Sequence, residues 1–307
     1  MSKCSFFNDI CISYACVFFF FLSGYVYKSK DADSFFYGKL KSLLLPIIFF
    51  EGFNLFIFVI LKVINFEKYY DKLAFGGVWF PLSLIYIVSI YYLIDNKLVK
   101  KSKFLSLVKI FSAVVFLVVG LLYAKRISDT PNQPIATAMV GYFFFTIGNL
   151  FAMYVSLLFK EIKIKRIIRF LCFVIGIILF VVLYLFIGFT ERNVDMYSSR
   201  YGNSILFIIN ALLGSFGLLF FSLGIGKSRI LEYYGKNTLM LLFVHHPIWR
   251  CSDYLLDKLG LLSGGYKSFV VFIISLTVGT FLVWIINRYF PWLTGKIEFS
   301  DKDIKEE

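Results

Sequence analysis

Charged side chains are scarce in this chain, and the scarcity excludes a soluble globular protein. Only 17% of the 307 residues are charged, whereas 59% are hydrophobic and 21% are aromatic. Soluble domains contain about half apolar and a quarter charged residues. The charges that do occur fall in short clusters between long apolar runs, as expected when each run crosses about 30 Å of hydrocarbon. The sequence therefore predicts an integral membrane protein.

Three other patterns are missing, and each absence removes a class of function. The five cysteines form no Cys-x-x-Cys pair, so we interpret them as buried thiols and expect no metal site. No small-residue cleavage site follows the first apolar run, which argues against a cleavable signal peptide. The net charge of +13 is spread over many loops, so we expect no nucleic acid partner.

Long apolar runs dominate what is present, and they predict an all-α polytopic bundle of about nine transmembrane spans. The third run is short, with Pro81 in its first turn, where proline is tolerated. The eighth spans only if it begins near Arg229. We expect one membrane domain over residues 1–294 and a polar, solvated tail over 295–307. The runs cover residues 10–27, 43–65, 78–94, 105–123, 138–159, 167–189, 204–225, 229–249 and 268–289.

Loop charge predicts the orientation of these spans. One alternating set of loops, with the tail, carries 19 Lys and Arg residues, against 10 in the N-terminus and the other loops. Positively charged loops stay in the cytoplasm. We therefore expect a cytoplasmic C-terminus and an external N-terminus. The cytoplasmic set is 28–41, 95–104, 160–169, 226–236 and the segment from 290 onward.

Four short motifs occur in a fixed order along the chain. The first apolar run closes on Ser23-Gly24-Tyr25, and a basic stretch, Lys39-Leu40-Lys41, precedes Leu43-Leu44-Leu45-Pro46. Gly77-Val78-Trp79-Phe80-Pro81 opens the third run. Gly235-Lys236-Asn237-Thr238 precedes His245. In this order the motifs resemble those of membrane acyltransferase family three, bacterial integral-membrane enzymes that mostly acetylate sugars.

That resemblance implies an acyltransferase of the bacterial inner membrane. The donor would be acyl-CoA, most simply acetyl-CoA, bound as a substrate and not as a tight cofactor. The acceptor would be a sugar hydroxyl in surface polysaccharide, lipopolysaccharide or a lipid-linked precursor. In the family, a helix carrying the histidine held to be catalytic precedes the Ser-Gly-Tyr run, whereas this chain starts about one turn before that run. We therefore expect the family's ten-helix pattern without its first helix.

Two alternatives remain open for the function. Without the first-helix histidine, the chain could be a truncated, inactive acyltransferase homologue. A transporter or flippase for the same glycans should show paired broken helices or inverted halves, and the sequence shows neither.

Acyl transfer to a hydroxyl needs a general base, and the chain offers few candidates. The two histidines, His245 and His246, both lie at the outer end of the eighth run. His245 matches the family's late histidine and is the candidate base, with helix capping as the alternative. Glu51 lies in the middle of the second run, where an ionisable group is a functional candidate by default. Alternatively, Glu51 is protonated and bonded to a neighbouring helix through Asn54, Asn149 or Asn210.

Other residues are candidates for binding the two substrates. Lys41 and Lys39 could contact the phosphates of acyl-CoA, although topology alone requires some of these charges. Trp79 could stack on a sugar, and an interfacial anchor would look the same in sequence. Arg192, in the polar loop with Asp195 and Arg200, could approach an exported glycan, although external loops are polar in any case.

Overall fold

Helices account for nearly all of the chain that the computed structural model describes. The described residues are 14, 16–28, 32–60, 78–96, 104–127, 134–159, 166–187, 194–260 and 264–294. Within these ranges there is no β-strand, only an isolated bridge between Asp195 and Arg200. A helix satisfies its backbone hydrogen bonds within one segment, which is what hydrocarbon demands of a spanning element. The prediction of an all-α membrane protein is confirmed.

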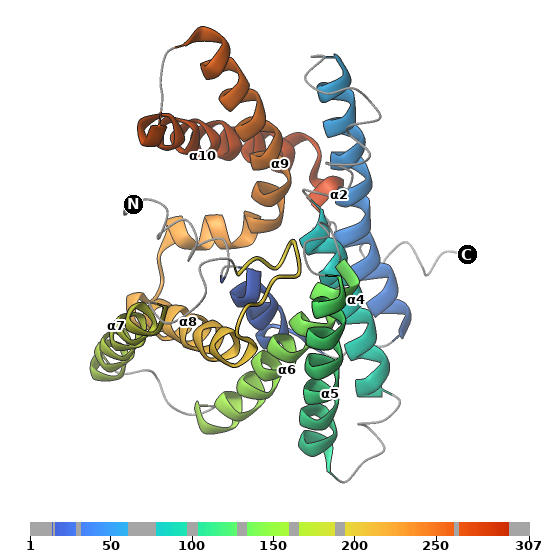
Figure 1. Cartoon of the computed structure of the whole chain (residues 1–307), viewed down its shortest axis with the longest axis vertical. Helices are drawn as coiled ribbons and strands as arrows, with labels where there is room; N and C mark the ends of the chain where they lie inside the picture. The colour runs from blue at the N-terminus through green and yellow to red at the C-terminus, as the bar shows by residue number, and fades with distance from the viewer. Residues whose placement is uncertain are drawn as a thin grey trace, which may run out of the picture. The chain divides into compact units, whose positions relative to one another are not determined.

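The first of two compact units comprises residues 1–29 and 82–228. It begins in the described chain with a short helix, Cys16–Tyr25. In this unit α5 packs against α6, and α7 packs against α8. Its longer helices, drawn from teal to orange in Figure 1, are α4 (Trp79–Ile94, in this unit from Leu82), α5 (Leu105–Arg126), α6 (Pro134–Phe159), α7 (Arg166–Ile187) and α8 (Ser204–Ile225).

The second unit comprises residues 30–81 and 229–307. Helix α9 packs against α10, and α2 contacts both α9 and η2. The ring of Phe50 on α2 stacks on that of Phe243 on α9, with centroids 5.1 Å apart. The elements of this unit are α2 (Ala32–Ile60), α9 (Arg229–Leu259), α10 (Gly264–Tyr289) and the 3-10 helix η2 (Pro291–Thr294).

Each expected apolar run contains a helix. Among the residues that the structure describes, five helical segments are long and apolar enough to cross a bilayer, whereas Cys16–Tyr25 and α4 are shorter apolar helices. The total of about nine spans therefore stays a prediction. The five segments are Leu105–Arg126, Pro134–Val155, Arg166–Ile187, Ser204–Ile225 and Tyr266–Tyr289.

Two helices extend about ten residues beyond the boundaries that hydropathy predicts. Helix α2 begins at Ala32, so the expected basic loop over 28–41 is wrong from that residue onward. Helix α9 continues past residue 249 to Leu259. Hydropathy indicates which residues can lie in hydrocarbon. A helix, by contrast, continues until its backbone hydrogen bonds stop, and polar residues can belong to it. The polar tail expected over residues 295–307 lies outside the described residues.

Candidate functional site

A buried ion pair joins α4 to α5 in the first unit. The ammonium nitrogen of Lys109 lies 2.9 Å from Oδ1 of Asp95. Lys109 is 6% exposed and Asp95 is 8% exposed. Asp95 directly follows α4, and Lys109 lies in the second turn of α5. The loop-charge count predicts that these helix ends face the cytoplasm. Each charge lowers the cost of burying the other, so the two ends are held together.

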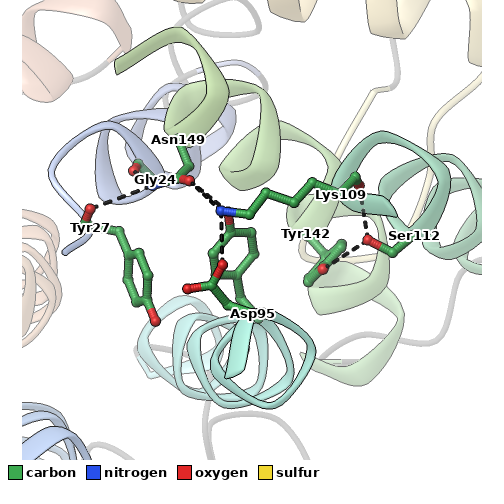
Figure 2. A network of polar contacts seen from close by, with 8 residues as sticks. Gly24, Tyr27, Asp95, Lys109, Ser112, Tyr142 and Asn149 are labelled. Atoms are coloured by element: carbon green, nitrogen blue, oxygen red, sulfur yellow. Dashed lines mark hydrogen bonds and ion pairs between the residues drawn. The ribbon is translucent and has the colours of Figure 1, made fainter. Parts of the chain in front are cut away.

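Asn149 of α6 connects this pair to the first helix of the unit. Its Oδ1 accepts hydrogen bonds from Lys109 Nζ at 3.3 Å and from the Tyr91 hydroxyl at 2.6 Å. Its Nδ2 donates to the carbonyl oxygens of Gly24 at 3.3 Å and Tyr27 at 3.4 Å. Figure 2 shows Lys109 reaching across to Asp95 and Asn149. One amide on α6 thus links the end of the helix Cys16–Tyr25, and the chain just after it, to α4 and α5.

Aromatic rings surround the polar atoms. Lys109 Nζ lies 5.2 Å from the centroid of the Tyr91 ring, within range of a cation–π interaction. Tyr91 also packs edge-on against Tyr27 and Phe145. The hydroxyls of Tyr142 and Ser112 are 3.2 Å apart, and Ser112 donates to the Lys109 carbonyl. This shell excludes water and strengthens the electrostatic contacts inside it.

Two glycines permit the close helix contact on which Asn149 depends. A Cβ atom at Gly24 would overlap the backbone carbonyl of Phe145, and one at Gly148 would overlap the carbonyl of Phe21. Small residues let helix backbones approach closely in membranes. The Ser-Gly-Tyr motif therefore has a packing function at Gly24, which brings the Gly24 carbonyl within reach of Asn149.

A second polar cluster lies at the opposite, predicted outer end of the same unit. Asp195 Oδ2 accepts from the Ser198 hydroxyl at 2.7 Å, and Asp195 Oδ1 accepts from the backbone N–H of Tyr197. The Thr137 hydroxyl donates to the Met196 carbonyl at 2.9 Å, fixing the turn on α6. The expectation that Asp195 lies in a polar loop holds, but its carboxylate is occupied within the turn.

Tyr201 and Asn210, which follow this turn, lie on either side of Phe207 in the chain, and the ring of Phe207 is buried. The Tyr201 ring centroid is 4.9 Å from that of Phe207, and Tyr14 stacks on Phe207 at 6.2 Å. Asn210 Nδ2 donates to the Tyr14 hydroxyl at 3.5 Å. Burial raises the pKa of Tyr201, so this phenol remains protonated. We call Tyr14, Tyr201 and Asn210 the outer cluster.

His245 is exposed on α9 of the second unit. Its Nδ1 lies 3.1 Å from the carbonyl oxygen of Leu241. A carbonyl only accepts hydrogen bonds, so this contact favours the tautomer with the proton on Nδ1. That tautomer has its lone pair on Nε2, as a general base requires. The His246 side chain lies outside the described residues.

Side chains in and just before the Gly-Lys-Asn-Thr segment form hydrogen bonds between α9 and α10. Asn237, which is 4% exposed, accepts a hydrogen bond from Asn287 Nδ2 at 2.8 Å. One turn earlier, the hydroxyls of Tyr234 and Thr280 are 3.1 Å apart. Lys236 instead pairs with Glu232 at 2.7 Å on the exposed face. Asn237 thus has a helix-packing role that the motif alone did not reveal.

The other predicted site residues are spread over different elements. Glu51 and Lys41 are partly buried on α2, and Trp79 is partly buried at the start of α4 beside Phe80. The Lys39 side chain and Arg192 lie outside the described residues. Roles for these five residues in binding or catalysis stay predictions. Two of the amides considered as partners for Glu51, Asn149 and Asn210, bond to other groups in the first unit.

Sequence reasoning missed the Asp95–Lys109 pair. Hydropathy places Asp95 in the loop over 95–104 and Lys109 within the apolar run 105–123. A lysine inside an otherwise apolar run was the available signal, because such a charge needs a partner or a polar cavity. Its partner could not be identified without the packing of α4 on α5.

Comparison with known proteins identifies a family for this chain. A family model described as an acyltransferase domain, that of acyltransferase family three, matches residues 5–288. Searches of curated proteins and of solved structures returned no match.

Proposed function

Because the chain belongs to acyltransferase family three, we propose that it transfers an acetyl or similar short acyl group from acyl-CoA to a sugar hydroxyl. The acceptor sugar belongs to a surface polysaccharide, a lipopolysaccharide or a lipid-linked precursor. The family match over residues 5–288 carries the proposal, since it extends across described helices of both units.

The reaction assigns a task to His245. The hydroxyl oxygen forms a bond to the acyl carbon, the carbon–sulfur bond of the thioester breaks, and the thiol of CoA leaves. The hydroxyl proton passes to a base and then to the departing sulfur. The Nδ1-protonated tautomer of His245 supports the role of base, because Nε2 then carries the lone pair. Lys41 and Lys39 are proposed to contact the phosphates of CoA, with Trp79 and Arg192 on the acceptor side.

Membranes containing the full chain provide the test. They are incubated with acetyl-CoA labelled in the acetyl group, together with glycan from the source cell, and label in the glycan is measured. We expect label with the wild type, loss of label in His245→Ala, and retention in the neighbouring control His246→Ala. A wild type that leaves the glycan unlabelled contradicts the proposed function. Equal labelling by wild type and His245→Ala removes His245 from the mechanism.

A further inference from the structure

Three cations lie at the inner end of the α7–α8 hairpin, the end expected to face the cytoplasm. Arg166 and Arg169 belong to the start of α7, and Lys227 follows the glycine that ends α8. All three residues are exposed, and none of them has an ion-pair partner among the described residues. Helix α7 has no acidic residue in its first turn. We call Arg166, Arg169 and Lys227 the inner basic cluster.

The cluster draws its charges from two helices, because α8 ends beside Arg169. Gly226 has a φ of +75°, and its N–H donates to the Ser222 carbonyl at the end of α8. Nη1 of Arg169 lies 3.4 Å from the position that a Cβ atom would take at Gly226. Lys227 is the next residue, with its Cα about 3.8 Å from that of Gly226. Arg166 lies one turn before Arg169 on the same face of α7.

Close packing of α7 on α8 fixes the helix ends that carry the cluster (Figure 1). A Cβ atom at Gly224 would overlap the backbone of Phe173, and one at Gly176 would overlap the backbone of Phe221. The rings of Phe173 and Phe221 stack with centroids 5.1 Å apart. Phe173 lies one turn after Arg169, so this contact is close to the cluster. The cations are therefore held in place before a ligand binds, which lowers the cost of binding.

Exposed apolar side chains border the cluster on both helices. Ile167 and Phe170 of α7 and Ile225, the last residue of α8, are all exposed. Three like charges without a described carboxylate beside them repel one another, so an anionic ligand would stabilise this end of the hairpin. A soluble anion would use the charges alone, whereas a lipid also covers the apolar border with its acyl chains. The combination indicates a ligand with a negatively charged head and a hydrocarbon tail.

We propose that the inner basic cluster binds the phosphate group of an anionic phospholipid. The guanidinium groups of Arg166 and Arg169 donate paired hydrogen bonds to the phosphate oxygens, and Lys227 adds a point charge. Basic residues just cytoplasmic of a spanning helix attract anionic lipids in this way. The proposal does not rest on acyl transfer, and it holds equally for an inactive homologue.

Thermal unfolding in mixed micelles tests the site without measuring turnover. The purified full chain in a neutral detergent is heated with phosphatidylglycerol, with phosphatidylcholine of the same acyl chains, or with coenzyme A as a soluble phosphate compound. We expect phosphatidylglycerol but not phosphatidylcholine to raise the melting temperature of the wild type. The triple variant Arg166→Gln, Arg169→Gln, Lys227→Gln should bind phosphatidylglycerol about a hundredfold more weakly, because each surface cation contributes roughly fivefold. Any shift with coenzyme A should be the same in the wild type and this variant.

A matched variant removes the same number of charges elsewhere. Lys125→Gln, Arg126→Gln, Lys258→Gln changes three exposed cations in the last turns of α5 and α9, and it should keep the wild-type shift. If the cluster variant does not fold, Arg169→Gln alone should weaken phosphatidylglycerol binding about fivefold, against no change for Arg126→Gln.

Three results would overturn the proposal. The first is an equal shift with phosphatidylglycerol and phosphatidylcholine, or an equal affinity of the wild type and the cluster variant for phosphatidylglycerol. The second is an equal loss of affinity in the matched variant, since net charge and not this site would then attract the lipid. The third is a shift with coenzyme A that the cluster variant abolishes, which would assign the three cations to a soluble phosphate compound.

Discussion

The two ends of the first unit bury polar groups in opposite ways. At the predicted inner end, Lys109 has the Asp95 carboxylate, the Asn149 amide and the Tyr91 ring around it. At the predicted outer end, the amide oxygen of Asn210 is buried without a hydrogen-bond partner among the described residues. A fully hydrogen-bonded buried network fixes the helices that contribute to it. The difference indicates that the inner network contributes more to holding the helices together than the outer cluster does.

The largest expected effect comes from breaking the inner ion pair. Lys109→Ala leaves the Asp95 carboxylate buried without its cation, which should lower the free energy of unfolding by about 3–5 kcal/mol. Denaturation of the purified protein by SDS titration in mixed micelles measures this loss. The double variant Lys109→Met, Asp95→Leu should be much less destabilised, because it buries no charge. If the single and double variants lose equal stability, charge pairing is not what holds α4 to α5.

The next largest effect is expected at Gly24, whose close helix contact lets Asn149 reach the first helix. Gly24→Ala places a methyl group against the Phe145 backbone, which cannot move as a flexible side chain would. Overpacking of this kind costs about 1–3 kcal/mol. Gly52→Ala is the matched control, since outside its own stretch of helix no described atom lies within 4 Å of its added Cβ. It should stabilise α2 by up to about 1 kcal/mol through helix propensity. Equal melting temperatures for the two variants would refute the close-packing role of Gly24.

A smaller effect should follow the loss of one hydrogen bond from the inner network. Tyr91→Phe removes the donor to Asn149 Oδ1, while Lys109 continues to donate to that oxygen. We expect a loss of about 1 kcal/mol in the free energy of unfolding. Tyr86→Phe, on the exposed face of the same helix, should change it by less than about 0.5 kcal/mol. A Tyr91→Phe variant as stable as Tyr86→Phe would show that the 2.6 Å bond contributes nothing net.

The sequence predicted the helices better than it predicted the two polar sites. Long apolar runs are local signals, so each expected run contains a helix. The sequence offers Asn149 as a partner for Glu51, whereas its contacts with Gly24, Tyr91 and Lys109 join segments far apart in the chain. Nothing local specifies such pairings, because they depend on which helix faces pack together. The buried polar atoms of the outer cluster were equally inaccessible, since burial of a loop tyrosine cannot be deduced from its neighbours.

The smallest effect is expected from breaking an exposed ion pair whose N–O distance is similar to that of the buried pair. Lys236 lies 2.7 Å from Glu232, one helical turn earlier on α9, and both side chains are more than half exposed. Water screens both charges, so Lys236→Ala should change the free energy of unfolding by less than about 0.5 kcal/mol. Lys109→Ala breaks a pair of nearly the same length at several times that cost, which would show that burial and not distance sets the effect. A loss near 3 kcal/mol for Lys236→Ala, measured by the same SDS titration, would instead give the Gly-Lys-Asn-Thr lysine a structural role beyond its pairing with Glu232.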